Sequence, residues 1–207
     1  MKVLLINGSP NEKGCTHRAL REVADTLEKN GIETEIVSIG KKAIGGCIGC
    51  GGCAKNNHRC VFQKDIVNEI IDKFEAADGL VVGSPTYFMS PNGALSALLD
   101  RMFMTGVSCR MKPAAAVTSA RRGGTTSTLD VLYKYFLMSE MPVVSSNYAN
   151  MVHGHDPEEV EQDLEGLQTM RSVGSNMAWL LKSIEAGKKA GIQEPERETK
   201  IKTSYIR

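Results

Sequence analysis

The chain opens with a buried strand, a polar loop and the start of a helix in direct succession. Residues 3–6 form a continuous apolar run of the kind that is buried on both faces in a parallel sheet. The run ends in a loop rich in Gly, Ser, Asn and Thr, and a helical pattern begins near Thr16. Loop N–H groups and the partial positive charge of a helix start favour an anion, although an ordinary strand-to-helix turn has the same pattern.

The loop at residues 8–16 lacks the two best-known phosphate motifs. A Walker loop requires GxxxxGK[ST], but no lysine follows Gly14, and GxGxxG is absent from this turn. A pocket of hydroxyl and amide groups remains, which suits the terminal phosphate of a mononucleotide such as FMN. We therefore predict cofactor contacts from Ser9, Pro10, Asn11, Gly14, Cys15 and Thr16.

Strand and helix patterns alternate along the rest of the chain. We expect strands at residues 3–6, 32–39, 80–83, 114–118 and 143–146, and helices at residues 16–29, 65–77, 92–104, 125–138 and 156–187. This alternation predicts a flavodoxin-like doubly wound α/β fold, with a five-stranded parallel sheet in the order 2-1-3-4-5 and helices on both faces. The expected domain is 1–187, with a cysteine-rich loop at 45–60 after the second strand and a polar tail at 188–207.

The last predicted helix is unusually long. Asp156 suits the N-cap, Pro157 the first position and Glu159 the capping box, and apolar residues keep a three-four rhythm to Gly187. A helix of that length spans about 45 Å, more than a small sheet can cover. We expect the overhang to pack on another subunit, in a homodimer or homotetramer, while a frayed helix end is the alternative.

The predicted order places the loops after the first, third and fourth strands side by side, at the crevice where doubly wound sheets bind ligands. A flat ring system would fit between the segments that leave the third and fourth strands. The candidate residues are Pro85, Thr86, Tyr87, Phe88, Ser119, Ala120, Arg121, Gly123 and Gly124. Taken singly, these aromatic residues and glycines would be assigned to a core and a turn. Arg121 could meet the ring or the 2′-phosphate of NADPH, or simply lie in solvent.

Four cysteines follow the second predicted strand with the spacing Cys-x2-Cys-x2-Cys-x6-Cys. They are Cys47, Cys50, Cys53 and Cys60. Three thiolates within seven residues, with glycines between them, can wrap a compact iron–sulfur cluster. Structural zinc more often uses two separated CxxC pairs, and a loop of metal-free thiols remains the other alternative.

Several of these motifs resemble a known family. Gly8-Ser9-Pro10, Ser84-Pro85-Thr86-Tyr87 and Leu99-Asp100-Arg101 resemble the NADPH-dependent FMN reductases, and the cysteine array resembles the iron–sulfur flavoproteins within that flavodoxin-like group. The resemblance covers about residues 2–187. It implies bound FMN, a dimer or tetramer, and a 4Fe-4S cluster near the flavin edge of a neighbouring subunit. One departure is that a single Asp65 follows Cys60, where paired acidic residues are common in the family.

Composition narrows the partners. A net charge of +1 argues against nucleic acid, and no apolar run approaches the length of a membrane span, so we expect a cytoplasmic protein. His153 and His155 lack a carboxylate partner in the sequence pattern, and we place them in a surface loop that could reach a neighbour's flavin.

Three functions are compatible with these features. The first is an oxidoreductase that passes electrons from NAD(P)H through FMN to a small acceptor such as a quinone, a flavin, or a nitro or azo compound. The second is a carrier in which FMN and a 4Fe-4S cluster relay electrons between ferredoxin and a downstream acceptor. The third is a binding protein that senses redox state through its cysteines. For the first function the flavin, rather than a side-chain acid or base, carries the chemistry, so we expect no catalytic side chain.

Overall fold

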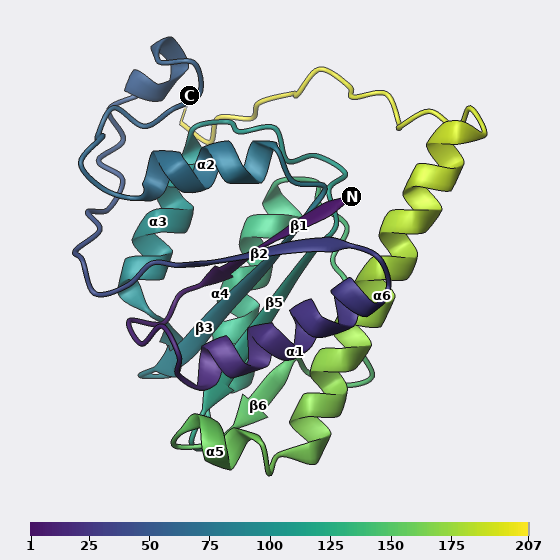
Figure 1. Cartoon of the computed structure of the whole chain (residues 1–207). Helices are drawn as coiled ribbons and strands as arrows, with labels where there is room; N and C mark the ends of the chain where they lie inside the picture. Colours follow the sequence, from purple (N-terminus) through teal and green to yellow (C-terminus); the bar gives the residue numbers. More distant parts are fainter. Residues whose placement is uncertain (207) are drawn as a thin grey trace.

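The computed structural model of the protein describes residues 1–206 and contains a parallel sheet covered by helices on both faces (Figure 1). Arg207, the last residue of the predicted tail, lies outside the described residues. The sheet order is β2 (Glu33–Ser38), β1 (Lys2–Asn7), β3 (Gly79–Tyr87), β5 (Ala114–Ala120) and β6 (Met151–His153), and β4 (Ser90–Pro91) pairs antiparallel with the end of β3. Apart from this small hairpin, the order is the predicted 2-1-3-4-5, so the predicted fold class is confirmed.

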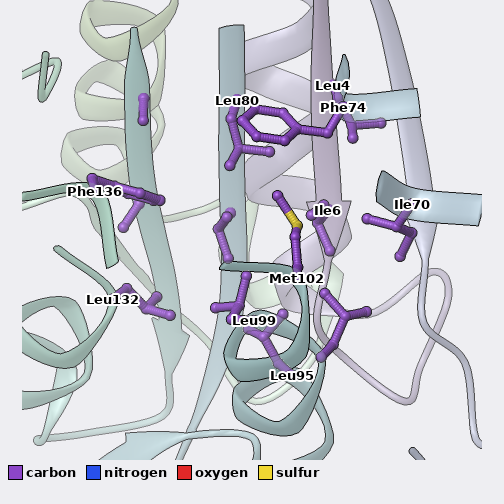
Figure 2. Close-up of a cluster of buried hydrophobic side chains, with 14 of the residues drawn as sticks. Leu4, Ile6, Ile70, Phe74, Leu80, Leu95, Leu99, Met102, Leu132 and Phe136 are labelled. Carbon is purple, nitrogen blue, oxygen red and sulfur yellow. The ribbon is translucent and has the colours of Figure 1, made fainter. Parts of the chain in front are cut away.

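Alternate residues of the central strands build two separate cores. Leu4 and Ile6 of β1 face α2 (Val67–Glu75), α3 (Gly93–Met104) and α4 (Thr125–Met138). Val3 and Leu5 face α1 (Cys15–Lys29) and α6 (Leu164–Lys189) on the other side of the sheet. Figure 2 shows the first core, in which the labelled side chains of the strands and the three helices point toward one another. Each such side chain contributes roughly 1.5–3 kcal/mol by leaving water, which explains why the strands are apolar on both faces.

The fifth parallel strand lies later in the chain than predicted. We expected it at residues 143–146, but Val143 makes only an isolated bridge to Ala114, and the strand that joins the sheet is β6. The amide of Val144 still donates to the carbonyl of Ala114, at 2.8 Å, before the chain leaves the sheet. The side-chain amide of Asn150 then donates to the carbonyl of Ala116 at 3.0 Å and takes the place of a backbone ladder contact.

The predicted last helix is two helices. Asp156 caps α5 (Pro157–Val160) by accepting from the amide of Glu159, as predicted, but α5 ends after one turn. Asp163 then accepts from the amide of Gly166 at 2.9 Å and starts α6. A second capping aspartate therefore interrupts a continuous apolar rhythm, which periodicity alone does not reveal. Within residues 1–206, Leu181 is the last buried residue of α6, and the final two turns extend beyond this packed part.

The remaining elements lie close to their predicted positions. α1 ends at Asn30 and Gly31, as the sequence predicts, while β3 and β5 run further than expected, to Tyr87 and Ala120. The cysteine loop leaves the sheet after β2, contains one short 3-10 turn, η1 (Gly52–Lys55), and returns at α2. Within residues 1–206, no helix combines the length and the apolar character that crossing a bilayer would require.

Candidate functional site

Four loops meet in one pocket at the carboxyl edge of the sheet. The loops follow β1, β3, β5 and β6, and the pocket between them has a volume of about 350 Å³. Its lining residues are Ser9, Asn11, Gly14, Cys15, Thr16, Pro85, Thr86, Tyr87, Ser119, Ala120, Arg121, Gly154, His155, Asp156 and Pro157. This is the edge at which parallel strands of a doubly wound sheet bind ligands, so the topology places the candidate site.

The first loop is shaped by the buried Asn7 at the end of β1. Its side-chain oxygen accepts from the amide of Ser9 at 3.1 Å, and its side-chain amide donates to Ser38 at 3.1 Å. The hydroxyl of Ser9 in turn accepts from the amide of Asn11 at 3.1 Å. This chain of hydrogen bonds folds the loop into a fixed cradle around the beginning of α1.

The start of α1 presents backbone donors to the pocket. Its N-cap is Gly14, which has no side chain to accept from the amides of the first turn. Those amides and the helix dipole therefore favour an anion at this end of the pocket. Burial raises the pKa of the Cys15 thiol at the first helical position, so the thiol is neutral near pH 7 and does not repel a phosphate.

Threonines hold the second loop in place. The hydroxyl of Thr86 lies 3.0 Å from that of Thr118 on β5 and 3.2 Å from that of Thr128 on α4. A further hydroxyl pair, Thr16 with Ser119 at 2.9 Å, joins the first loop to the third. These contacts make the pocket walls one connected unit before any ligand is bound.

Most of the predicted cofactor residues line this pocket, but Pro10, Phe88, Gly123 and Gly124 do not. Pro10 lines a neighbouring hollow with Lys13 and Lys41. Phe88 is fully exposed at the tip of the β3–β4 hairpin.

The two predicted glycines have different surroundings. Gly124 adopts a left-handed conformation, and a Cβ there would lie 2.9 Å from Cα of Met89. The missing side chain therefore makes room for the β3–β4 hairpin and not for a ligand in this pocket. A Cβ at Gly123 would meet open space.

Two features of the site were not predicted from the sequence, namely the organising role of Asn7 and the fourth loop of the pocket. The signal for Asn7 was present, because an amide side chain directly after a buried strand can hydrogen-bond the turn that follows. The fourth loop, Gly154 to Pro157, was hidden by the misplaced fifth strand. His155, which we placed in a surface loop that could reach a neighbour's flavin, lines the pocket of its own chain.

The four cysteines of the array line a second pocket, of about 210 Å³, beside the end of α3. The rest of its lining is mostly apolar and comprises Ile48, Gly49, Gly51, Ala54, Val61, Phe62, Arg101, Met104 and Thr105. All six cysteines of the chain carry free thiols. In residues 1–206, no group of three or more Cys, His, Asp or Glu side chains is arranged to hold a single metal ion.

Donors already approach two of these sulfur atoms. The amide of Gly49 lies 3.5 Å from Sγ of Cys47, and Nε of the buried Arg101 lies 3.2 Å from Sγ of Cys60. Hydrogen bonds to sulfur are one means by which proteins tune thiolate-ligated clusters. Cys109 lies outside this pocket and packs against the first core, and burial raises the pKa of its thiol.

Comparisons with known proteins match this chain both to the FMN reductase family and to individual iron-sulfur flavoproteins. A family model described as NADPH-dependent FMN reductase matches residues 1–156. An iron-sulfur flavoprotein of Methanocaldococcus jannaschii is 36% identical over 194 residues, which cover 89% of this chain and 100% of that protein. An iron-sulfur flavoprotein of Methanosarcina thermophila is 27% identical over 190 residues, which cover 89% of this chain and 97% of that protein.

Solved structures agree with the fold. A WrbA-like flavodoxin from Agrobacterium tumefaciens superposes with a TM-score of 0.62 at 19% identity, over 88% of this chain and 97% of that one. An azoreductase from Bacillus anthracis superposes with a TM-score of 0.60 at 13% identity, over 84% of this chain and 98% of that one. At these identities the likeness establishes the shared architecture.

Proposed function

This chain belongs to the NADPH-dependent FMN reductase family, and from that premise we propose that it binds FMN at the four-loop pocket and passes electrons from NAD(P)H to a small acceptor. The family establishes an FMN-dependent oxidoreductase in general terms. The site, the electron donor and the acceptor class, a quinone, a flavin, or a nitro or azo compound, are the proposal.

One observation carries the proposal. The loops after β1, β3 and β5 converge on a single pocket whose first wall is the start of α1, with Gly14 as its N-cap. The donor set suits FMN, because backbone amides and the hydroxyls of Ser9 and Thr16 match a phosphate, while Pro85 and Tyr87 offer flat apolar surfaces for a ring.

The residues divide the work by position. The first loop and α1 would bind the phosphate and fix the depth of the ligand in the pocket. The second loop would orient the ring, since its position is set by the contacts of Thr86 with Thr118 and Thr128. Arg121 adds a positive charge at the third loop, where it could stabilise anionic ligand groups. FMN itself, when bound, supplies hydride acceptance and electron transfer in one- or two-electron steps.

A second candidate function is the relay of electrons through FMN and a 4Fe-4S cluster, with ferredoxin as a partner. It is favoured by the gathering of Cys47, Cys50, Cys53 and Cys60 on one mostly apolar pocket, and by relatives whose names describe iron-sulfur flavoproteins. Four thiols with hydrogen bonds already directed at two of them form a donor set that fits such a cluster. The four cysteines would hold it, and electron transfer would be its contribution.

We also propose that the protein assembles as a homodimer or homotetramer. Trp179 is 71% exposed on α6, and Phe88 and Met89 project from the β3–β4 hairpin. Large apolar side chains in such positions are typical of surfaces that another subunit covers. Light scattering of the purified protein should give the mass of two or four chains, and the mass of one chain would reject this assembly.

The proposed function is tested by comparing FMN with riboflavin, which lacks the phosphate. Quenching of flavin fluorescence should give an FMN affinity at least about a hundredfold higher, because charged hydrogen bonds to the phosphate contribute several kcal/mol together. NADPH or NADH added without oxygen should then bleach the bound flavin. Equal affinities would reject the phosphate site, and an unbleached flavin would reject the reductase.

Iron and sulfide analysis of the anaerobically purified protein tests the second candidate. About four irons per chain are expected for a 4Fe-4S cluster with four cysteine ligands. If the protein binds FMN but takes up no iron or sulfide on reconstitution, the relay function is rejected and the simple FMN reductase stands.

A further inference from the structure

Arg101 is a fully buried cation that the flavin pocket does not use. It lies on α3 with 2% of its surface exposed, and it is the largest of the fully buried side chains in residues 1–206. Charged side chains are almost never buried to this extent unless they are paired. Its surroundings therefore indicate what it does.

All five N–H donors of the Arg101 guanidinium are matched by acceptors from the cysteine loop and the residues that follow it. Nε donates to Sγ of Cys60 at 3.2 Å. One terminal nitrogen donates to the carbonyl of Gly45 at 3.2 Å and to Asp65, and the other donates to the carbonyl of Phe62 and to Asp65, both at 3.1 Å. The ring of Phe62 also lies 5.5 Å from the guanidinium carbon.

These acceptors come from both ends of the loop. Gly45 is where the chain enters it, and Cys60, Phe62 and Asp65 are where the chain returns to α2. Asp65 neutralises the buried charge and also accepts from the amide of Val67 at the start of α2. One rigid group on α3 therefore joins the two ends of the loop to each other and to the helical layer.

The other cysteines are held differently. Cys47 and Cys50 are exposed, and Gly49 and Gly51, on either side of Cys50, adopt left-handed conformations that only glycine takes readily. Cys53 is half-buried, and its thiol lies 3.5 Å from the carbonyl oxygen of Met104. Cys60, by contrast, is anchored by a buried, charged donor.

We infer that Arg101 is the positioning residue of the cysteine site: it fixes Cys60 and both loop ends before a cluster is bound, so that the other three cysteines close onto a sulfur already in place. The cluster part of this inference rests on the second candidate function, whereas the anchoring of the loop does not. Lysine cannot replace arginine here, because a single ammonium group cannot reach acceptors spread around a planar fork.

The test compares the wild type with Arg101→Lys and with a matched control, Arg110→Lys. Arg110 lies outside the cysteine loop and pairs with Glu140. In the metal-free proteins, limited proteolysis should cut the loop of Arg101→Lys about tenfold faster than that of the wild type, and Arg110→Lys should behave as the wild type. FMN affinity, measured in parallel, shows that the sheet and its pocket are intact in each variant.

Reconstitution with iron and sulfide gives the second readout. Arg101→Lys should bind the cluster roughly tenfold more weakly than the wild type, and any cluster it retains should have a more negative reduction potential, because a hydrogen bond to sulfur is lost. If the wild type takes up no iron, the relay function is rejected, but the proteolysis result still tests whether Arg101 anchors the loop. Equal loop protection in Arg101→Lys and the wild type would overturn the inference, as would equal iron uptake and potential in a wild type that does assemble the cluster.

Asp65→Asn keeps the inference testable if Arg101→Lys does not fold. This variant retains the five donors but removes the neutralising carboxylate, so its loop should be cut several-fold faster than that of the wild type. Where both single variants fold, the double variant should show no added effect, since both changes act on one anchor. A loop in Asp65→Asn as resistant as the wild type would count against the anchor.

Discussion

The side-chain amide of Asn92 donates a hydrogen bond of 2.8 Å to the carbonyl of Gly8. Asn92 caps α3 by accepting from the amide of Ala94 at 3.0 Å, and Gly8 begins the loop that cradles the start of α1. The cap of one helix is thereby joined to the end of the pocket formed by the start of α1. The same helix carries Arg101 to the cysteine pocket, so α3 contacts both candidate sites.

Replacing Asn92 separates its two roles. Asn92→Ala should lower the free energy of unfolding by about 2 kcal/mol, roughly 1 from the cap and 1 from the bond to Gly8. Asn92→Asp keeps the cap but loses the donor to Gly8, so it should lower the free energy of unfolding by only about 1 kcal/mol. Both variants should weaken FMN binding to a similar degree, because both lose the bond to Gly8. Urea unfolding and fluorescence titration measure the two effects. Equal FMN affinity in the wild type and both variants would show that the bond to Gly8 does not shape the pocket.

Gly8 itself has no room for a side chain. A Cβ there would lie 2.5 Å from Leu95 Cδ2 and 2.7 Å from the backbone oxygen of Gly83. Gly8→Ala should therefore destabilise the protein by about 1–3 kcal/mol through overpacking and weaken FMN binding by displacing the loop. Gly93→Ala is the control, because a Cβ at the first position of α3 meets nothing within 4 Å and should be neutral or slightly stabilising. Similar losses in both variants would contradict this steric explanation.

The hairpin tip stores backbone strain. Phe88 and Met89 both have positive φ, at 50° and 59°, in a two-residue turn for which Asn-Gly is the favoured sequence. The double replacement Phe88→Asn with Met89→Gly should raise the free energy of unfolding by about 1–2 kcal/mol, since it relieves both strained residues. Phe88→Ala, which keeps a Cβ, should give no such gain. Thermal unfolding measures both variants. A gain in the double variant alone would support strain relief, and an equal gain in Phe88→Ala would assign the effect to the loss of an exposed apolar side chain.

Glu22 should contribute to the acid sensitivity of the fold. Burial raises its pKa, but hydrogen bonds from Arg171 and Arg18 outweigh burial and leave the pKa below its ordinary value of 4.5. A lowered folded-state pKa means that the stabilisation is complete above 4.5 and is lost as the pH falls through the folded-state value.

The corresponding variant is Glu22→Gln. It should be less stable than the wild type by about 1 kcal/mol at pH 7, and the difference should shrink as the pH drops below 4.5. Urea unfolding at a series of pH values measures this, with Glu196→Gln in the exposed C-terminal segment as the control. A difference that stays constant with pH would exclude Glu22 as the titrating group.

The cysteines should fall into two functional classes. Cys53→Ala, within the cysteine pocket, should abolish iron and sulfide uptake on reconstitution, whereas Cys109→Ala, outside it, should leave uptake unchanged. Both variants should keep FMN affinity within about twofold of the wild type, because neither residue lines the flavin pocket. Undiminished iron uptake by Cys53→Ala would remove it from the ligand set.

The sheet order was predictable because its strands are marked by strong local signals. Residues 3–6, 80–83 and 114–118 are apolar runs buried on both faces, and helical patterns separate them. The fifth strand was not predictable in the same way. β6 has only three residues, and the Val143–Val144 pair before it has an equally apolar sequence but makes one bridge. Which of two short segments joins the sheet depends on tertiary contacts such as that of Asn150 with Ala116.

The candidate site was predictable to the extent that the strand order was. The loops after the first, third and fourth parallel strands were located because the predicted order brings them together, and the loop at Gly154 was missed with the strand that precedes it. Arg101 was visible in the sequence only as part of a family motif. Its burial and its five acceptors depend on residues up to fifty-six positions away, which no local pattern encodes.

Because Gly45 and Phe62 meet at one guanidinium, the cysteine loop leaves and re-enters the fold at almost the same point. The entropy of closing such a loop changes only slowly with its length. The segment can therefore be shortened, extended or exchanged for another sequence with little effect on the register of the sheet behind it. A fold built in this way can exchange its cysteine loop for another segment while the pocket at the carboxyl edge of the sheet stays as it is.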